Sequence, residues 1–175
     1  MTAVEERPAR EVLTDFAAAA GIAIAPSLLR LVGHAVGHEP THFVPLDQQQ
    51  DPRDWRWDLD SPPDNVDRQI IIGSPGELIL TLDVDGTLSL AEFSVRWYSQ
   101  DPVALQREEG RVAIAGSSEP SVRSSEFDAA FRRLRRKRRA RYRRCIRCDE
   151  MTPPEWWHGD GHCQGCAERY LGVVH

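Results

Sequence analysis

The sequence has 175 residues, of which 41% are hydrophobic, and a formal net charge of −5. This length allows one modest domain with an appendage, and the apolar content is ordinary for a globular chain. No apolar run approaches the length of a membrane span, so we expect neither a transmembrane helix nor a membrane partner.

The charge is divided unequally along the chain. Residues 1–130 contain ten Lys and Arg against twenty-two Asp and Glu, whereas residues 131–175 contain twelve against five. The first part therefore carries a net charge of −12 and the second a net charge of +7. We expect the two parts to have different partners or to bind each other.

Two helices are predicted in the first thirty-five residues. The segment Pro8–Ala20 has apolar residues at helical spacing and is followed by Gly21, a typical helix stop. A second helix is predicted to start at Pro26 and to weaken at Gly33. The apolar residues of the second helix are Leu28, Leu29, Leu31 and Val32.

The most strand-like part of the chain predicts a three-stranded antiparallel meander. Its apolar segments are Ile70–Ile72, Leu78–Val84 and Leu88–Trp97. They are separated by Ser74-Pro75-Gly76 and by Asp85-Gly86, both of which are turn sequences.

The segments on either side of this meander carry weaker signals. Residues 47–68 are a polar connection in which Trp55 and Trp57 can place one strand on a core. After the meander, Val112–Ala115 predicts a further strand, and residues 117–125 predict a flexible linker. The sequence thus predicts an α+β fold, with an acidic α+β domain at residues 1–116.

A long basic helix is predicted at residues 126–144. Ser125 and Asp128 form a start that is similar to a capping box, and the arginines lie toward the other end of the helix dipole. An apolar stripe can dock this helix on the rest of the protein, and Arg138 interrupts the stripe. The stripe consists of Phe127, Ala130, Phe131 and Leu134.

Beyond Arg138 the predicted helix is charged nearly all round, so burial cannot hold it in place. It must project into solvent or lie against an anionic surface. One arginine guanidinium can bind two phosphate oxygens at once, which favours a nucleic-acid backbone as that surface. The alternatives are a protein partner, a solvated helix, or neutralisation by the acidic half of this chain or of a second copy. The candidate nucleic-acid-binding residues are Arg132, Arg133, Arg135, Arg136, Arg139 and Arg143.

The four cysteines of the chain form two pairs with metal-ligand spacing, namely Cys145, Cys148, Cys163 and Cys166. Two thiolates separated by two residues can bend around one cation, and a second pair completes a tetrahedron with Zn–S bonds of about 2.3 Å. Fourteen residues lie between the pairs, slightly fewer than is usual. We predict a structural Zn²⁺ as the cofactor, and neither His158 nor His162 is needed as a ligand.

A redox dithiol and disulfide bonds are the alternatives for these cysteines. A redox motif is expected after a strand of a βαβ unit and as one pair rather than two. The start of the chain, Met1–Glu6, is acidic and has no apolar segment of a signal peptide, so we expect a cytoplasmic protein with reduced cysteines.

The residues around the two pairs resemble a treble-clef or zinc-ribbon module. The first pair is followed by a loop with two prolines, a short hairpin at Trp156–Gly161, and a helix that starts at the second pair and stops at Gly172. The resemblance covers residues 145–172 and implies a four-coordinate zinc with no open position for water. The predicted module occupies residues 145–175, and structural zinc supplies folding free energy on the order of 10 kcal/mol.

Two other stretches resemble enzyme motifs. The segment Asp83-Val84-Asp85-Gly86-Thr87 resembles the first motif of haloacid-dehalogenase-like phosphohydrolases, which implies Asp83 as nucleophile, Asp85 as general acid and base, and a nearby Mg²⁺. That family needs a parallel sheet, whereas Asp85-Gly86 is also a preferred hairpin turn. The segment His38-Glu39-Pro40-Thr41-His42 resembles the zinc-metallopeptidase motif, but Pro40 disfavours the helix that this motif requires.

The sequence therefore predicts a non-enzymatic zinc-binding protein. Its zinc-capped, arginine-rich helix is predicted to contact an anionic partner, either nucleic acid or an acidic protein surface. A phosphohydrolase that uses Asp83 and Asp85 is one alternative. A neutralising or inhibitory protein, whose acidic half covers a basic partner, is the other.

Overall fold

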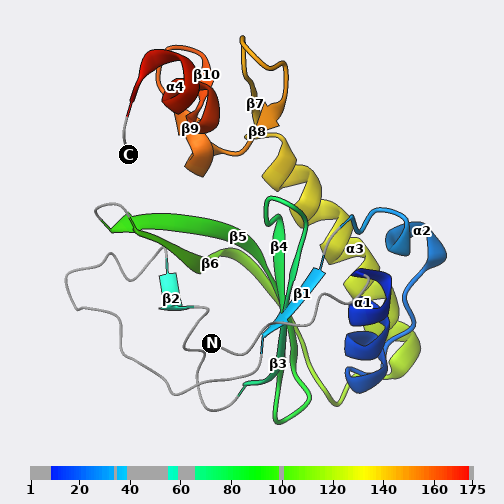
Figure 1. Cartoon of the computed structure of the whole chain (residues 1–175). Coiled ribbons are helices and arrows are strands. Elements are labelled where there is room, and N and C mark those ends of the chain that lie inside the picture. Colours follow the sequence, from blue (N-terminus) through cyan, green and yellow to red (C-terminus); the bar gives the residue numbers. More distant parts are fainter. Residues whose placement is uncertain (1–8, 34, 39–54, 59–65, 99–100, 174–175) are drawn as a thin grey trace.

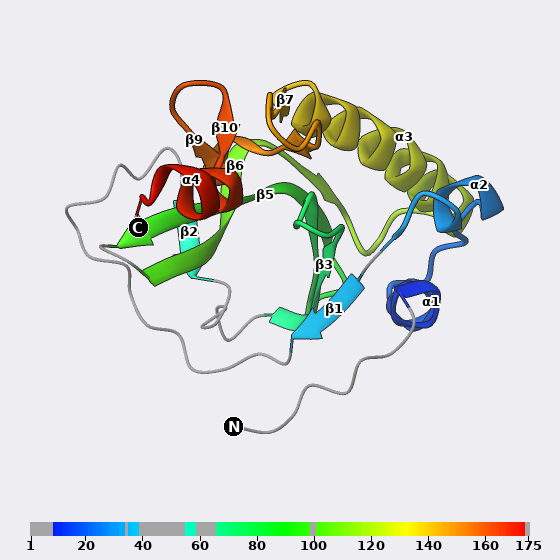
Figure 2. The ribbon, with the colours of Figure 1, turned by 45° about the horizontal axis from the view of Figure 1, so that its top comes forward.

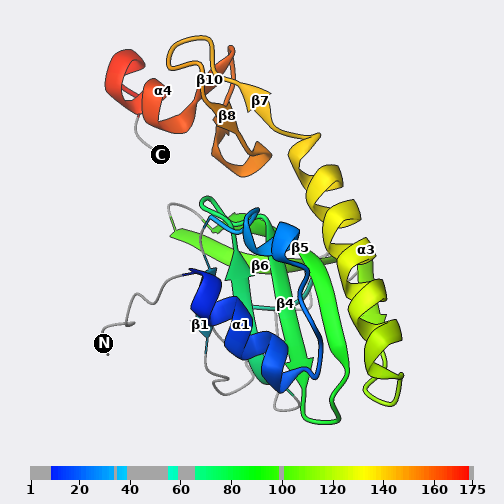
Figure 3. The same ribbon diagram turned by 90° about the vertical axis from the view of Figure 1, so that its right-hand side faces the viewer.

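A curved sheet, helices on one of its faces and a small C-terminal module make up the molecule (Figure 1). The structure is a computed structural model, and it describes residues 9–33, 35–38, 55–58, 66–98 and 101–173. The C-terminal module lies beyond the end of the longest helix, as Figure 3 shows. This arrangement confirms the predicted α+β fold class.

Six strands form the sheet in the order β1-β3-β4-β5-β6-β2, and every neighbouring pair is antiparallel. The strands are β1 Ala35–His38, β2 Trp55–Asp58, β3 Val66–Ile72, β4 Leu78–Asp83, β5 Leu88–Tyr98 and β6 Asp101–Ile114. The predicted meander corresponds to β3, β4 and β5, with Leu80 paired to both Ile70 and Leu90. The meander prediction is confirmed, and Figure 2 shows how strongly the sheet curves.

Strand β6 is much longer than the predicted strand at Val112–Ala115. It begins at Asp101 and pairs with β5 along its length, from Tyr98↔Asp101 to Leu88↔Ile114. Residues 106–109 of this strand read Gln-Arg-Glu-Glu, which has no apolar alternation. This polar stretch forms a strand because its backbone pairs with the long strand β5. The local sequence pattern gives no sign of that pairing.

The main core lies between the sheet and the helices. Alternate residues of β4 and β5 face the helices, so that Leu78, Leu80 and Leu90 are fully buried. Helix α1, Ala9–Ala19, contributes Leu13 and Phe16 to this core. Helix α2, Pro26–Leu29, is a single turn that contributes Leu28. Figure 2 shows α1, α2 and α3 on the same side of the sheet.

Helix α3 extends from Pro120 to Arg139, and both of its ends differ from the prediction. The helix starts six residues before the predicted 126, so residues 120–125, predicted as linker, are helical. Pro120 occupies the first turn, and the Glu119 carboxylate caps the helix by accepting a hydrogen bond from the Ser121 N–H at 2.8 Å. Ser125 is therefore not the cap. The predicted apolar stripe is confirmed, because Phe127, Ala130, Phe131 and Leu134 are all buried.

The C-terminal module begins directly after α3. The helix ends at Arg139 rather than at the predicted Arg144, because Arg143 and Arg144 form strand β7 and pair with β8, Met151–Thr152. A one-turn 3₁₀ helix, η1 Pro154–Trp156, follows. A second hairpin comes next, with β9 Trp157–His158 and β10 His162–Cys163, and then helix α4 Gln164–Leu171.

This order of elements matches the predicted hairpin and terminal helix. Helix α4 ends at Gly172, whose φ of 64° is left-handed and accounts for the stop. The two hairpins and α4 lie beyond the C-terminal end of α3 (Figure 1), and this part of the chain carries both cysteine pairs.

Candidate metal centre and arginine helix

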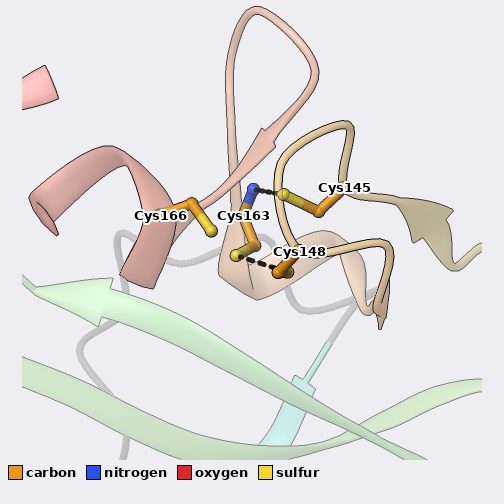
Figure 4. Close-up of side chains that lie close together, drawn as sticks. All are labelled: Cys145, Cys148, Cys163 and Cys166. Carbon is orange, nitrogen blue, oxygen red and sulfur yellow. Dashed lines mark hydrogen bonds between the residues drawn. The ribbon is translucent and has the colours of Figure 1, made fainter. Parts of the chain in front are cut away.

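The four cysteine side chains converge between the two hairpins and the start of α4 (Figure 4). Their sulfur atoms all lie within 4.8 Å of one another. Cys148 Sγ and Cys163 Sγ are 3.8 Å apart. A tetrahedral zinc with bonds of about 2.3 Å separates its sulfur ligands by about 3.8 Å. The donor set and its spacing therefore fit one four-coordinate metal ion.

Backbone hydrogen bonds hold the loops that carry these sulfur atoms. The Asp149 N–H donates to the Cys145 carbonyl at 2.9 Å, which closes a tight turn around the first pair. The Ile146 N–H donates to the Gly161 carbonyl at 2.9 Å and joins that turn to the second hairpin. The Cys163 N–H points at Cys145 Sγ, 3.3 Å away. An N–H group directed at a sulfur favours the thiolate, which is the metal-binding form.

The thiols differ widely in acidity. Burial acts to raise the pKa of Cys145, but the N–H groups of Cys148, Cys163 and Arg147 outweigh it and lower this pKa to about 6. Burial, together with hydrogen bonding to the other three cysteines, raises the pKa of Cys166 to about 12. Four thiolates this close repel one another, so complete deprotonation requires a compensating cation.

No disulfide bond joins the four cysteines in the structure. Throughout the described parts of the chain, these four residues are the one group of His, Cys, Asp or Glu that brings ligand atoms together in this way. Neither His158 nor His162 belongs to the group.

Three arginines of α3, Arg135, Arg138 and Arg139, bind carboxylates of the same chain. Arg135 Nε lies 2.5 Å from one oxygen of Glu77, and Arg139 Nε lies 2.9 Å from the other. Lys137 and Arg141 both pair with Glu92. Glu77 is 5% exposed and Glu92 is 1% exposed. These charges are thus neutralised internally, which was one of the alternatives left open by the sequence.

Arg138 makes the most buried ion pair between α3 and the C-terminal module. Its two terminal nitrogens donate to the two oxygens of Glu155 at 2.7 and 2.9 Å, and its guanidinium lies over the Tyr142 ring. Glu155 also accepts a hydrogen bond from the Ser94 hydroxyl of β5 at 2.8 Å. The Arg138–Glu155 pair therefore ties η1 to both α3 and the sheet.

The same pairing fixes the charge state of Glu155. Burial alone would raise the pKa of this carboxyl, but the hydrogen bonds and the charge of Arg138 lower it below its usual value. Glu155 is therefore ionised at neutral pH, as an ion pair with Arg138 requires. Sequence reasoning identified Arg138 as an interruption of the apolar stripe but did not find its partner.

The six arginines predicted to bind nucleic acid have different environments in the structure. Arg135 and Arg139 bind Glu77, and Arg132 donates to the Ser27 hydroxyl at 2.9 Å. Arg143 lies with its guanidinium carbon 5.8 Å from the Trp157 ring centre. Arg133 and Arg136 are exposed, and neither forms an ion pair within the described residues.

The phosphohydrolase alternative is not favoured by the sheet. Asp83 ends β4, which is antiparallel to both of its neighbours, rather than a strand of a parallel sheet. Asp85 accepts a hydrogen bond from the Thr87 N–H at 2.8 Å, and Gly86 has a φ of 80°, so these residues form a hairpin turn. Lys137, the single lysine of the chain, pairs with Glu92. Hydrogen bonds from Thr87 lower the pKa of Asp85, which does not favour a proton-donating role.

The metallopeptidase alternative involves residues that are mostly outside the described part. His38 is the last residue of strand β1, whereas the motif requires it on a helix. Residues 39–42 lie outside the described residues.

Comparison with known proteins adds no family assignment: no protein-family description, curated protein or solved structure matches this chain. Among the helices that the structure describes, none combines the length and the apolar character needed to cross a membrane. The candidate site therefore has to be interpreted from its own geometry.

Proposed function

We propose that this chain is a non-enzymatic binding protein with one structural Zn²⁺, held by Cys145, Cys148, Cys163 and Cys166. The observation that carries the proposal is the convergence of four sulfur atoms within 4.8 Å. Four thiolates fill the coordination shell of zinc, which leaves no position for a reactive water. When bound, zinc would cross-link the two hairpins to α4 in a treble-clef-like module, which is too small to bury a core unaided.

The partner that we propose is the phosphate backbone of a nucleic acid, contacted by the outer side of α3. At 3.6 residues per turn, Arg133 and Arg136 lie on the side of the helix opposite the buried Phe131 and Leu134. Arg132 and Arg143 are also exposed and flank this side. Guanidinium groups on one helix face match the spaced, singly charged phosphates of a strand.

The internal ion pairs support this reading of the helix by dividing its charges. On the side of the helix that faces the sheet, cationic residues form ion pairs with Glu77, Glu92 and Glu155. Arg135 and Arg139 both form ion pairs with Glu77, so we do not include these two residues in the proposed interface. Arg133 and Arg136 have no carboxylate partner among the described residues, and the buried ion pairs hold the helix that presents them.

Nucleic-acid binding by the zinc-loaded chain over a series of salt concentrations tests this proposal. Changing Arg133 and Arg136 to glutamine should weaken binding and reduce the slope of log affinity against log salt by about 1.4 to 1.8, since each phosphate contact contributes about 0.7 to 0.9. The matched control changes Arg10 and Arg68 to glutamine, which removes the same charge from exposed positions outside α3. No binding by the unchanged chain even at low salt would exclude nucleic acid, and equal slopes for both variants would exclude this face.

A further inference from the structure

A pocket lies at the junction between the end of α3 and the C-terminal module. Its volume is about 460 Å³, and it is lined by Ala140, Arg141, Tyr142, Arg143, Pro154 and Trp157. These residues come from two segments, the turn that follows α3 and the stretch from η1 to β9. The volume falls within the range of roughly 300 to 1,000 Å³ that is typical of small-molecule sites.

The lining combines flat rings with one cation that no carboxylate neutralises. Arg141 is engaged by Glu92, so its charge is already compensated. Arg143 is exposed, and its guanidinium lies over the Trp157 ring at 5.8 Å. In the described part of the chain no carboxylate pairs with Arg143. An aromatic face next to an uncompensated guanidinium is the combination that binds a base and its phosphate.

The outer side of α3 leads directly to this pocket. Arg136 precedes Ala140 by four residues, and the Ala140 N–H donates to the Arg136 carbonyl at 3.0 Å, so the two residues lie one above the other. Four residues of helix, about 6 Å, separate them along the axis. A strand whose phosphates follow Arg133 and Arg136 therefore reaches Ala140 and the mouth of the pocket with its next nucleotides.

We propose that this pocket binds one unstacked base of a single-stranded nucleic acid, with Trp157 as the stacking surface and Arg143 on the adjoining phosphate. The inference rests on the proposed function and specifies the form of its partner. A base within a duplex is stacked on both sides and can enter a pocket only at the cost of unstacking and unpairing, whereas a single strand presents its bases freely. Arginines and aromatic residues on one path are typical of proteins that bind single strands.

The experiment compares three oligonucleotides of the same length with the zinc-loaded full chain. They are a single strand, its duplex, and a single strand of abasic sites that keeps every phosphate and has no bases. We expect the single strand to bind more tightly than both others. Loss of one base–aromatic stack corresponds to a decrease of about 5- to 150-fold in affinity, so the abasic strand should bind more weakly by a factor in this range.

Variants of the pocket test the assignment of the stacking residue. Trp157→Leu should reduce affinity for the single strand to that of the abasic strand and should leave abasic binding unchanged, while Trp157→Phe should retain the preference. Arg143→Gln should weaken binding of both strands, because it removes a phosphate contact. Zinc content and near-ultraviolet circular dichroism of each variant verify that the module remains folded.

The outcomes separate failure of this inference from failure of the proposed function. If the unchanged chain binds the base-containing and abasic strands equally, the pocket does not hold a base, although the phosphate-binding face of α3 stands. Unchanged discrimination in Trp157→Leu would also overturn the inference. If no oligonucleotide binds at low salt, both are wrong, and binding of a poly-glutamate peptide instead would assign the arginines to an acidic protein partner.

Discussion

Changing Glu155 to glutamine tests how strongly the C-terminal module is joined to the rest of the molecule. The substitution keeps the size of the side chain but removes its charge, so the Arg138 guanidinium, whose side chain is 1% exposed, loses its counterion. Removing one partner of a buried ion pair costs about 3 to 5 kcal/mol. Glutamine can still accept the hydrogen bond from Ser94, so we expect the low end of this range, about 3 kcal/mol of unfolding free energy.

Urea unfolding of the zinc-loaded chain at a fixed free zinc concentration measures this loss. Asp149→Asn is the matched control, because it also removes the acid of an arginine pair in the module. That pair, Arg144 with Asp149, has side chains that are 60% and 80% exposed, so its loss should cost less than about 1 kcal/mol. The double variant Arg138→Met with Glu155→Leu removes both buried charges and should recover most of the stability. Equal costs for Glu155→Gln and Asp149→Asn would refute the reasoning.

Three further predictions concern acid, packing and metal. The lowered pKa of Glu155 means that its stabilising effect is complete above its ordinary value of 4.5 and is lost as the pH falls through the folded value. The stability difference between the unchanged chain and Glu155→Gln should therefore shrink when urea midpoints are measured from pH 6 down to pH 3, and a constant difference would contradict this. Gly76→Ala places a methyl group 2.8 Å from the Phe93 ring and should cost about 1 to 3 kcal/mol in thermal unfolding. Gly33→Ala, with no heavy atom within 4 Å, should change stability by less than about 0.5 kcal/mol. Cys148→Ser should lower the zinc content after dialysis well below one ion per chain by plasma mass spectrometry, and full retention would contradict a four-thiolate site.

The parts of the structure that sequence predicts well are those set by local chemistry. The meander follows from alternating apolar residues such as Leu78 and Leu80 and from the turn signal at Asp85-Gly86. The turn itself is longer than the predicted two residues, because the Gly86 N–H donates to the Asp83 carbonyl and β5 begins only at Leu88. The cysteines were found because metal geometry restricts ligand spacing. The start of α3 could also have been predicted from the sequence, because Glu119 can cap a helix and Pro120 is favoured in its first turn. The Gly and Ser residues around them favoured a linker instead.

The remaining features depend on pairing between distant residues. Glu77 and Arg139 are 62 positions apart, and nothing in either local sequence identifies the other. One signal was present: Glu92 continues the series Leu88 and Leu90 on the face of β5 that is turned toward the helices. A carboxylate at an inward position requires a cation beside it, and the basic run at residues 132–144 supplied the candidates, of which Lys137 and Arg141 pair with Glu92. Reading these two facts together would have assigned part of the basic helix to the interior.

The Arg138–Glu155 pair also joins residues that leave the ribosome at different times. All strands of the large sheet and the whole of α3 precede residue 140, whereas Glu155 is synthesised after them. A guanidinium without a counterion must stay hydrated, so water has to remain between the end of α3 and β5 until Glu155 docks. The C-terminal module thus completes the larger part of the molecule, and the dry contact under the end of α3 forms only after Glu155 has been synthesised.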